Sequence, residues 1–149
     1  MDIRELYQEL ILDHGTQPRN FCALENASHF AEGYNPLCGD KIQLFLQIKN
    51  EHITSVSFQG SGCAISTASA SLMTEALLGK TRQEASLLFE ALQALMTQDN
   101  LATVSLAELG KLAALSGVHT FPARVKCATL PWHTLISALK GEKNNVSTE

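Results

Sequence analysis

The fold is decided by residues 41–63, which read KIQLFLQIKNEHITSVSFQGSGC. From Lys41 to Ile48 an apolar core residue recurs at every second position, the period of a strand that has one face in the core. Residues 49–51 offer a turn, and the alternating run from His52 to Gln59 predicts an antiparallel partner strand. We expect a third strand around Ser28 to Tyr34.

Helical spacing flanks these strands on both sides. The first helix is predicted from the apolar stripe Ile3, Leu6, Tyr7, Leu10 and Ile11 and should end near Gly15. The later helices are expected from Cys63 to about Gly79, from a capping box at 81–84, from a second capping box at 105–108 to about Gly117, and from Phe121 to Leu139, with a kink or restart at Pro131.

Strands that come first and helices that follow, without β-α-β alternation, indicate an α+β domain. We expect a small antiparallel sheet of about three strands covered on one side by helices. A chain of 149 residues with 45% hydrophobic side chains is typical of a single domain with a real core. Residues 1–140 are therefore predicted to form one domain and residues 141–149 a flexible polar tail.

Composition excludes several classes of partner. The net charge is −4 and the basic residues are scattered, which argues against nucleic acid and membrane surfaces. The N-terminus has neither a basic run nor a small-residue cleavage site, and no apolar run reaches the roughly 18 residues of a membrane span. We expect a cytoplasmic protein, in which the four cysteines are metal ligands or reactive thiols rather than disulfides.

Two of the cysteines stand in glycine-rich turns. The sequence NPLCGD, residues 35–40, is turn chemistry directly before a strand, so Cys38 and Asp40 should lie together on an exposed loop tip. The sequence GSGC, residues 60–63, places Cys63 at a helix N-terminus, where backbone N–H groups favour thiolate over thiol.

A third cysteine, Cys127, follows two cations, Arg124 and Lys126, which should give electrostatic support to its thiolate. Three thiols and one carboxylate are ligands that tetrahedral zinc accepts. The alternative is that the cysteines are small buried apolar side chains. Their spacings, with 24 and 63 intervening residues, match no zinc-finger signature and leave both interpretations open.

The chain resembles the iron–sulfur cluster assembly proteins of the NifU N-terminal and IscU type. The resemblance is carried by DHGTQPRNF (13–21), NPLCGD (35–40), FQGSGCAISTASASLM (58–73) and FPARVKCATLPW (121–132). Lys126, where IscU-type scaffolds carry a histidine, and the extra residues FPAR before it are similar to the SufU-type branch.

The resemblance implies a fold of the SufE/IscU type and a zinc ion bound by Cys38, Asp40, Cys63 and Cys127. It also implies a SufS-type cysteine desulfurase as partner, with the downstream iron–sulfur assembly machinery as a further partner. The chain departs from the family at Gly15, where a tyrosine is usual, and at Cys22, which we interpret as a bystander thiol.

The function that follows is a zinc-dependent sulfur acceptor, sulfurtransferase-like, which takes persulfide sulfur from the desulfurase, activates that enzyme and passes the sulfur on. Because a closed four-ligand site tempers its thiolates, one ligand must leave, and the exposed loop makes Cys38 the candidate. Two alternatives remain: a scaffold that carries a [2Fe–2S] cluster transiently on the same ligands, and a non-catalytic zinc-stabilised binding module.

Overall fold

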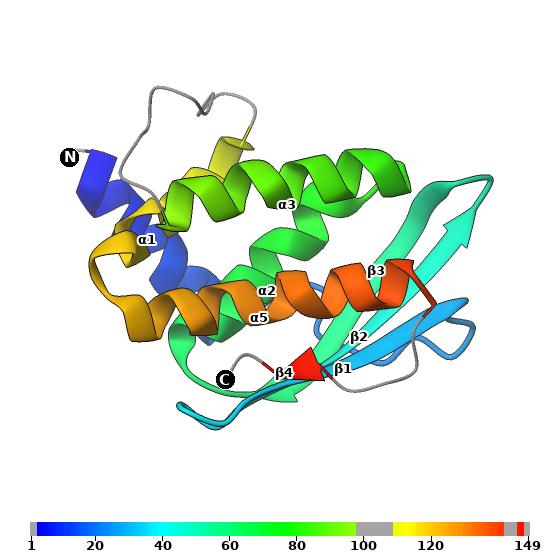
Figure 1. The fold of residues 1–149 in the computed structure, drawn as a ribbon, viewed down its shortest axis with the longest axis horizontal. Coiled ribbons are helices and arrows are strands. Elements are labelled where there is room, and N and C mark those ends of the chain that lie inside the picture. The colour runs from blue at the N-terminus through cyan, green and yellow to red at the C-terminus, as the bar shows by residue number, and fades with distance from the viewer. Residues whose placement is uncertain (1–2, 98–108, 142–145, 148–149) are drawn as a thin grey trace.

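The computed structural model describes residues 3–97, 109–141 and 146–147 (Figure 1). One sheet lies on one side of the molecule and the helices lie on the other. Along the chain the elements are α1 (Ile3–Thr16), β1 (His29–Asn35), β2 (Asp40–Lys49), β3 (His52–Ser61), α2 (Ala64–Leu77), α3 (Arg82–Thr97), the 3-10 helix η2 (Gly110–Thr120), α5 (Pro122–Leu139) and β4 (Val146–Ser147).

The sheet has the strand order β3-β2-β1-β4, and its first three strands pair antiparallel. The predicted three-stranded antiparallel sheet is therefore confirmed. The two residues of β4 pair in parallel with Gly33 and Tyr34, so they extend the edge of β1. A register shift between Gln47 and Ile48 leaves Ile48 half-buried, because a bulge re-aims the residue that follows it.

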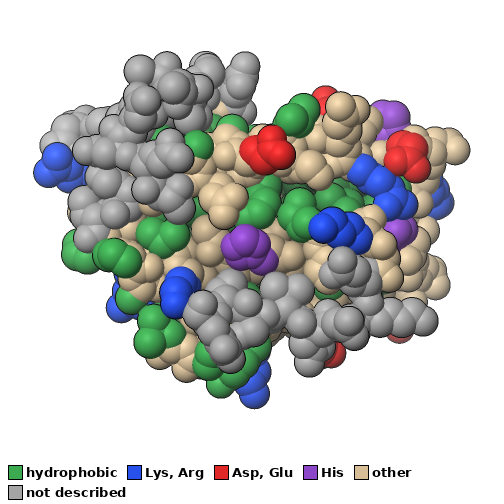
Figure 2. Space-filling view, viewed as in Figure 1, with side chains coloured by type: hydrophobic (Ala, Val, Ile, Leu, Met, Phe, Trp, Pro, Cys, Tyr) green, Lys and Arg blue, Asp and Glu red, His purple; other side chains and the backbone are tan. Residues whose placement is uncertain are grey.

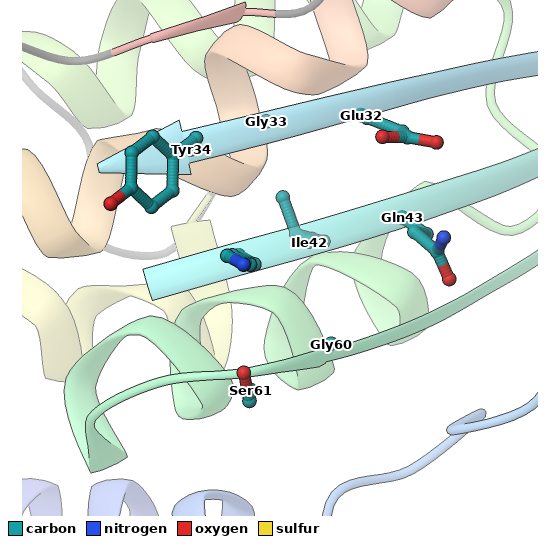
Figure 3. A pocket seen from close by; sticks show the side chains of 8 residues that line it. Glu32, Gly33, Tyr34, Ile42, Gln43, Gly60 and Ser61 are labelled. Carbon is teal, nitrogen blue, oxygen red and sulfur yellow. The ribbon is translucent and has the colours of Figure 1, made fainter. Parts of the chain in front are cut away.

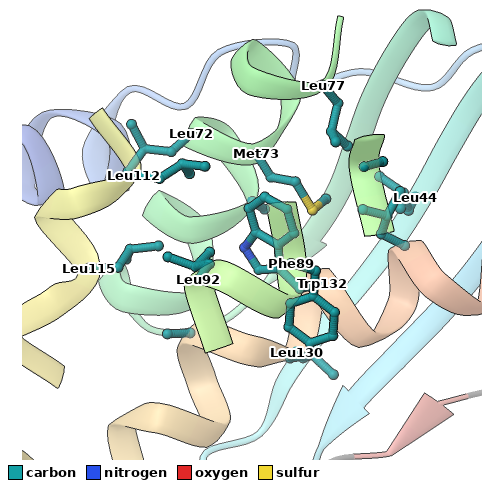
Figure 4. Close-up of a cluster of buried hydrophobic side chains, with 14 of the residues drawn as sticks. Leu44, Leu72, Met73, Leu77, Phe89, Leu92, Leu112, Leu115, Leu130 and Trp132 are labelled. Carbon is teal, nitrogen blue, oxygen red and sulfur yellow. The ribbon is translucent and has the colours of Figure 1, made fainter. Parts of the chain in front are cut away.

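The core fills the space between the sheet and the helices (Figure 4). Leu44 of β2, Met73 of α2 and Trp132 of α5 are each fully buried. Trp132 stacks on Phe89 of α3 with the ring centroids 5.9 Å apart, and its indole N–H donates to Ser69 at 3.2 Å. Burial of each such large apolar side chain stabilises the fold by about 1.5–3 kcal/mol, which fixes α5 against the sheet.

The first predicted capping box forms as expected. The backbone N–H of Thr81 donates to the Glu84 carboxylate at 2.9 Å, and the N–H of Glu84 donates to the Thr81 hydroxyl at 3.1 Å. The second box, at 105–108, lies outside the described residues. The helix expected to follow it differs from the prediction, because residues 110–120 form a 3-10 helix rather than an α-helix. Gly110, its first residue, has a φ of +55°, which lies outside the range of either right-handed helix.

α5 is one helix from Pro122 to Leu139, with Pro131 inside it. Within the described ranges, no helix has both the length and the apolar composition that a membrane crossing requires. On the face shown in Figure 2, basic, acidic and apolar side chains lie intermingled. This arrangement agrees with the scattered charge that the sequence predicts.

Candidate metal centre

The hairpin between β1 and β2 presents the first two site residues. Asn35 and Asp40 are paired at its end, and the Asn35 carbonyl accepts the N–H of Gly39 at 2.8 Å. The Asn35 side-chain oxygen accepts the N–H of Leu37 at 3.3 Å. Gly39 takes a φ of +74° with no atom within 4 Å of the place a Cβ would occupy. A tight, glycine-closed turn therefore carries Cys38 at its exposed tip.

Helix α5 supplies the third residue. The ligand atoms of Cys38, Asp40 and Cys127 all lie within 4.8 Å of one another, and we call these three residues the ligand trio. The Cys127 thiol donates to the sulfur of Cys38 at 3.2 Å. Asp40 and Cys127 are fully buried, whereas Cys38 is exposed. The trio is therefore closed on the protein side and open at Cys38.

The carboxylate of Asp40 is held from two sides. Its Oδ1 accepts the backbone N–H of Cys63 at 2.8 Å, and its Oδ2 accepts the amide of Asn35 at 3.1 Å. A Cβ on Gly62 would lie 2.5 Å from Asp40 Oδ1, so a glycine is needed for the close approach of the two segments. The glycine-rich turn therefore braces the carboxylate through backbone contacts.

Cys63 lies at the N-cap of α2, as predicted. Its sulfur is not part of the group of ligand atoms found within 4.8 Å of one another among the described residues. The backbone N–H of Cys63 nevertheless donates to Asp40 Oδ1 at 2.8 Å. The structure thus brings three of the four predicted ligands together and places the backbone of the fourth, Cys63, in contact with the Asp40 carboxylate.

Burial and hydrogen bonds act on the thiol of Cys127. Burial is the largest cause that raises the pKa of this thiol, followed by its hydrogen bonds with Cys38 and Asp40. Arg124 contacts Cys127, and the hydrogen bond raises the pKa of the guanidinium. Arg124 is exposed. Electrostatic support of a Cys127 thiolate by Arg124 and Lys126 stays a prediction.

Asn35 is a site residue that the sequence analysis did not single out. It is fully buried, and its amide donates both to Asp40 and to the sulfur of Cys127, the latter at 3.5 Å. The signal was present, because Asn35 opens the turn motif that carries Cys38 and Asp40. Cys22, by contrast, is exposed and is not part of the trio.

A hollow of about 510 Å³ crosses the sheet beside the site (Figure 3). Gly33, Ile42 and Gly60 form one row of paired residues across its floor. Tyr34 stands at its edge, with the ammonium of Lys41 5.8 Å from the ring centroid. None of the residues that line this hollow belongs to the ligand trio.

Fold and site together define a small α+β protein with a cysteine and aspartate centre at the end of an antiparallel sheet. Residues 6–128 match the NifU-like N-terminal domain. The chain therefore belongs to the family of NifU-like N-terminal domains.

Three relatives show how closely the chain follows this family. It is 41% identical to the zinc-dependent sulfurtransferase SufU of Bacillus subtilis, over 93% of this chain and 92% of that protein. It is 37% identical to the iron–sulfur cluster assembly scaffold protein IscU of Streptococcus pyogenes, over 95% of this chain and 87% of that protein. A crystal structure of an iron–sulfur cluster assembly scaffold protein for the SUF system, from Fervidobacterium islandicum, superposes with a TM-score of 0.83 at 36% identity. The superposition covers 93% of this chain and 99% of that one.

Proposed function

We propose that this chain is a zinc-dependent sulfur acceptor for iron–sulfur cluster biogenesis, and that Cys38 is the thiol that receives the sulfur. The observation that carries the proposal is the ligand trio: two thiols and a carboxylate lie within 4.8 Å of one another, with one thiol exposed. The similarity to the B. subtilis relative, which is named a zinc-dependent sulfurtransferase, supports it.

The donor set fits zinc. Thiolate and carboxylate ligands are those that tetrahedral zinc accepts. The buried Asp40 carboxylate is held in place by the backbone N–H of Cys63 and the side-chain amide of Asn35. Cys38, Asp40 and Cys127 would hold the ion, and Cys63, whose backbone N–H binds Asp40, would be the fourth ligand. When bound, zinc keeps its cysteine ligands deprotonated at neutral pH.

Cys38 is the ligand suited to leave and react. It is exposed at the tip of a hairpin turn, whereas Cys127 is buried in α5. Its thiolate would attack the outer sulfur of the donor's persulfide, so that a new S–S bond forms on Cys38 and the donor's S–S bond breaks. The donor cysteine departs as a thiolate, and Cys38 then carries the sulfur as a persulfide.

The donor in this proposal is a SufS-type cysteine desulfurase of the cytoplasm, and the recipient is the iron–sulfur assembly machinery. The chain would thereby act as a sulfurtransferase-like activator of the desulfurase. Residues 1–140 would work as the single functional domain, with residues 141–149 as its tail.

The test is peptide mapping of the extra sulfur after incubation with the desulfurase and cysteine, together with elemental analysis. About one zinc per chain and a persulfide on Cys38 are expected, and Cys38→Ala should abolish stimulation of the desulfurase. Cys22→Ser, which removes an exposed thiol outside the trio, is the matched control and should change neither result. A persulfide on Cys22 or Cys127, with stimulation intact in Cys38→Ala, would overturn the proposal.

A second candidate is a scaffold for a [2Fe–2S] cluster, favoured by the scaffold names of the S. pyogenes and F. islandicum relatives. The same thiols and carboxylate could ligate the cluster irons. Iron and labile sulfide in protein purified without oxygen would favour the scaffold, and zinc with persulfide uptake would favour the sulfur acceptor.

A further inference from the structure

The two sulfurs of the ligand trio are close enough to react with each other. Cys127 Sγ lies 3.2 Å from Cys38 Sγ, and a disulfide requires about 2.0 Å. The approach of just over 1 Å falls to Cys38, which is exposed at the tip of the hairpin turn. Cys127 itself is fixed, because it is buried and its sulfur receives the Asn35 amide.

We infer that Cys127 is a resolving thiol that frees the sulfur bound on Cys38 as sulfide. The inference rests on the proposed function, because it starts from a persulfide on Cys38. The sulfur of Cys127 attacks the inner sulfur, Cys38 Sγ, and a Cys38–Cys127 disulfide forms. The bond between Cys38 Sγ and the outer sulfur breaks, and the outer sulfur leaves as hydrogen sulfide with the protons of the persulfide and of the thiol.

The electrons in this step come from the protein. The outer sulfur is reduced to sulfide, and the two cysteines are oxidised to a disulfide. A cellular dithiol reductant must then reduce the disulfide before the next cycle. The disulfide uses the sulfurs of Cys38 and Cys127, which are two of the three donor groups of the trio. The oxidised chain therefore cannot hold the metal on the trio.

The geometry favours release of the outer sulfur as sulfide over its retention as a persulfide. The nucleophile lies beside the inner sulfur, and the outer sulfur of a persulfide on exposed Cys38 can point to solvent. The step needs Cys127 unligated, so it belongs to the metal-free protein. Bound zinc should therefore preserve the persulfide, and loss of zinc should allow its release.

The experiment starts from zinc-loaded protein that the desulfurase has charged with sulfur from ³⁵S-cysteine. The charged protein is separated from the donor, and zinc is then removed from one half of the sample with a chelator. Free sulfide, intact mass and peptide maps are recorded over time. The expected product is released labelled sulfide together with a chain two hydrogens lighter than the reduced protein, in which Cys38 is joined to Cys127. Zinc-loaded protein should keep its persulfide.

Two variants sharpen the result. Cys127→Ser should slow sulfide release by on the order of 100-fold or more, since the intramolecular thiol is removed and only bimolecular attack by other thiols remains. Cys22→Ser should release sulfide as the parent does, which excludes exchange between chains through that exposed thiol. Circular dichroism checks the fold of Cys127→Ser, and the disulfide map of the parent protein decides the matter without any variant.

A persulfide on Cys38 that stays intact in the metal-free parent, or that moves to Cys127 without disulfide formation, would overturn the inference and leave the proposed function standing. If the desulfurase places no sulfur on Cys38, the proposed function fails. The same time course after loading with glutathione persulfide then still shows whether Cys127 resolves Cys38.

Discussion

Asn35 joins the hairpin to α5 through a single amide, which donates to Asp40 and to Cys127. We expect Asn35→Ala to lower zinc affinity by about 10- to 100-fold, because groups that orient ligands contribute to metal affinity on that scale. Competition with a chromogenic chelator measures the change. Gln43→Ala, which truncates an exposed side chain on β2, is the control and should leave the affinity unchanged.

His14 connects α1 to α2. It is 1% exposed, its Nδ1 lies 2.7 Å from the Ser71 hydroxyl, and Glu75 lies 3.5 Å from its Nε2. Burial is the main cause that lowers the pKa of His14. Repulsion by Arg19 and Lys111 acts in the same direction, and Glu75 and Asp13 oppose it.

The lowered pKa of His14 predicts a loss of stability in mild acid. Above about pH 6.5 the imidazole is neutral in both states; below it the unfolded chain takes up the proton first, so stability falls until the pH passes the folded pKa. The unfolding temperature of metal-free protein should decrease between about pH 7 and 5.5. His14→Gln should weaken this dependence; an unchanged slope would contradict the assignment to His14.

At the scale of single residues, the sequence predicted where a side chain lies along the fold better than it predicted the burial and contacts of that side chain. The motif NPLCGD predicted both Cys38 and Asp40 on an exposed loop tip. Cys38 lies there, as predicted, but Asp40 is fully buried at the start of β2. The burial that raises the pKa of Cys127 could not be predicted, because the sequence shows the neighbours of a residue along the chain and not its tertiary packing. Asn35 was missed for a similar reason: its contact with Cys127 spans 92 positions of the chain.

At the scale of elements, the contact between β1 and α5 depends on Gly33. A Cβ there would collide with Thr134 Oγ1 and lie 3.0 Å from a Leu130 methyl. Gly33→Ala should therefore destabilise the protein by about 1–3 kcal/mol, the usual cost of overpacking, as measured by urea unfolding. Gly117→Ala, where no atom lies within 4 Å, should change stability by less than about 0.5 kcal/mol. Equal effects would argue against the collision.

Elements were predictable where a local pattern sets them. The alternation in residues 41–59 predicted β2 and β3, and the Thr81 box predicted the start of α3. The 3-10 geometry of η2 and the positive φ of Gly110 could not be predicted, because the helical spacing of the sequence does not distinguish a 3-10 helix from an α-helix. The parallel pairing of β4 with β1 could not be predicted either, because it is a long-range contact and the two residues of β4 show no strand pattern.

At the scale of the whole molecule, a metal at the trio would connect the β1–β2 turn to α5. Its ligands Cys38 and Cys127 are 89 positions apart along the chain. Zinc should therefore raise the unfolding temperature, because a ligand at about 100 times its Kd stabilises a protein by about 2.7 kcal/mol. Calorimetry with and without zinc measures this. Cys127→Ser should gain much less, and an equal gain would place the metal elsewhere.

The fold class and family followed from sequence because patterns and motifs are read along the chain. The centre required more, since Asp40 is held by the backbone of Cys63 and the amide of Asn35 while Cys127 arrives on the last helix. Such convergence depends on tertiary packing, which no local motif contains.

The pairing of Asn35 with Asp40 also constrains how this protein can evolve. Successive residues of a strand point to opposite faces, so one residue inserted into the turn between Asn35 and Asp40 that shifted the register would turn the carboxylate away from both thiols. Deletion of one residue would do the same. We therefore expect homologues to differ in the side chains of this turn but to keep its number of residues. The length of the turn should be more constant than the identity of any one residue in it.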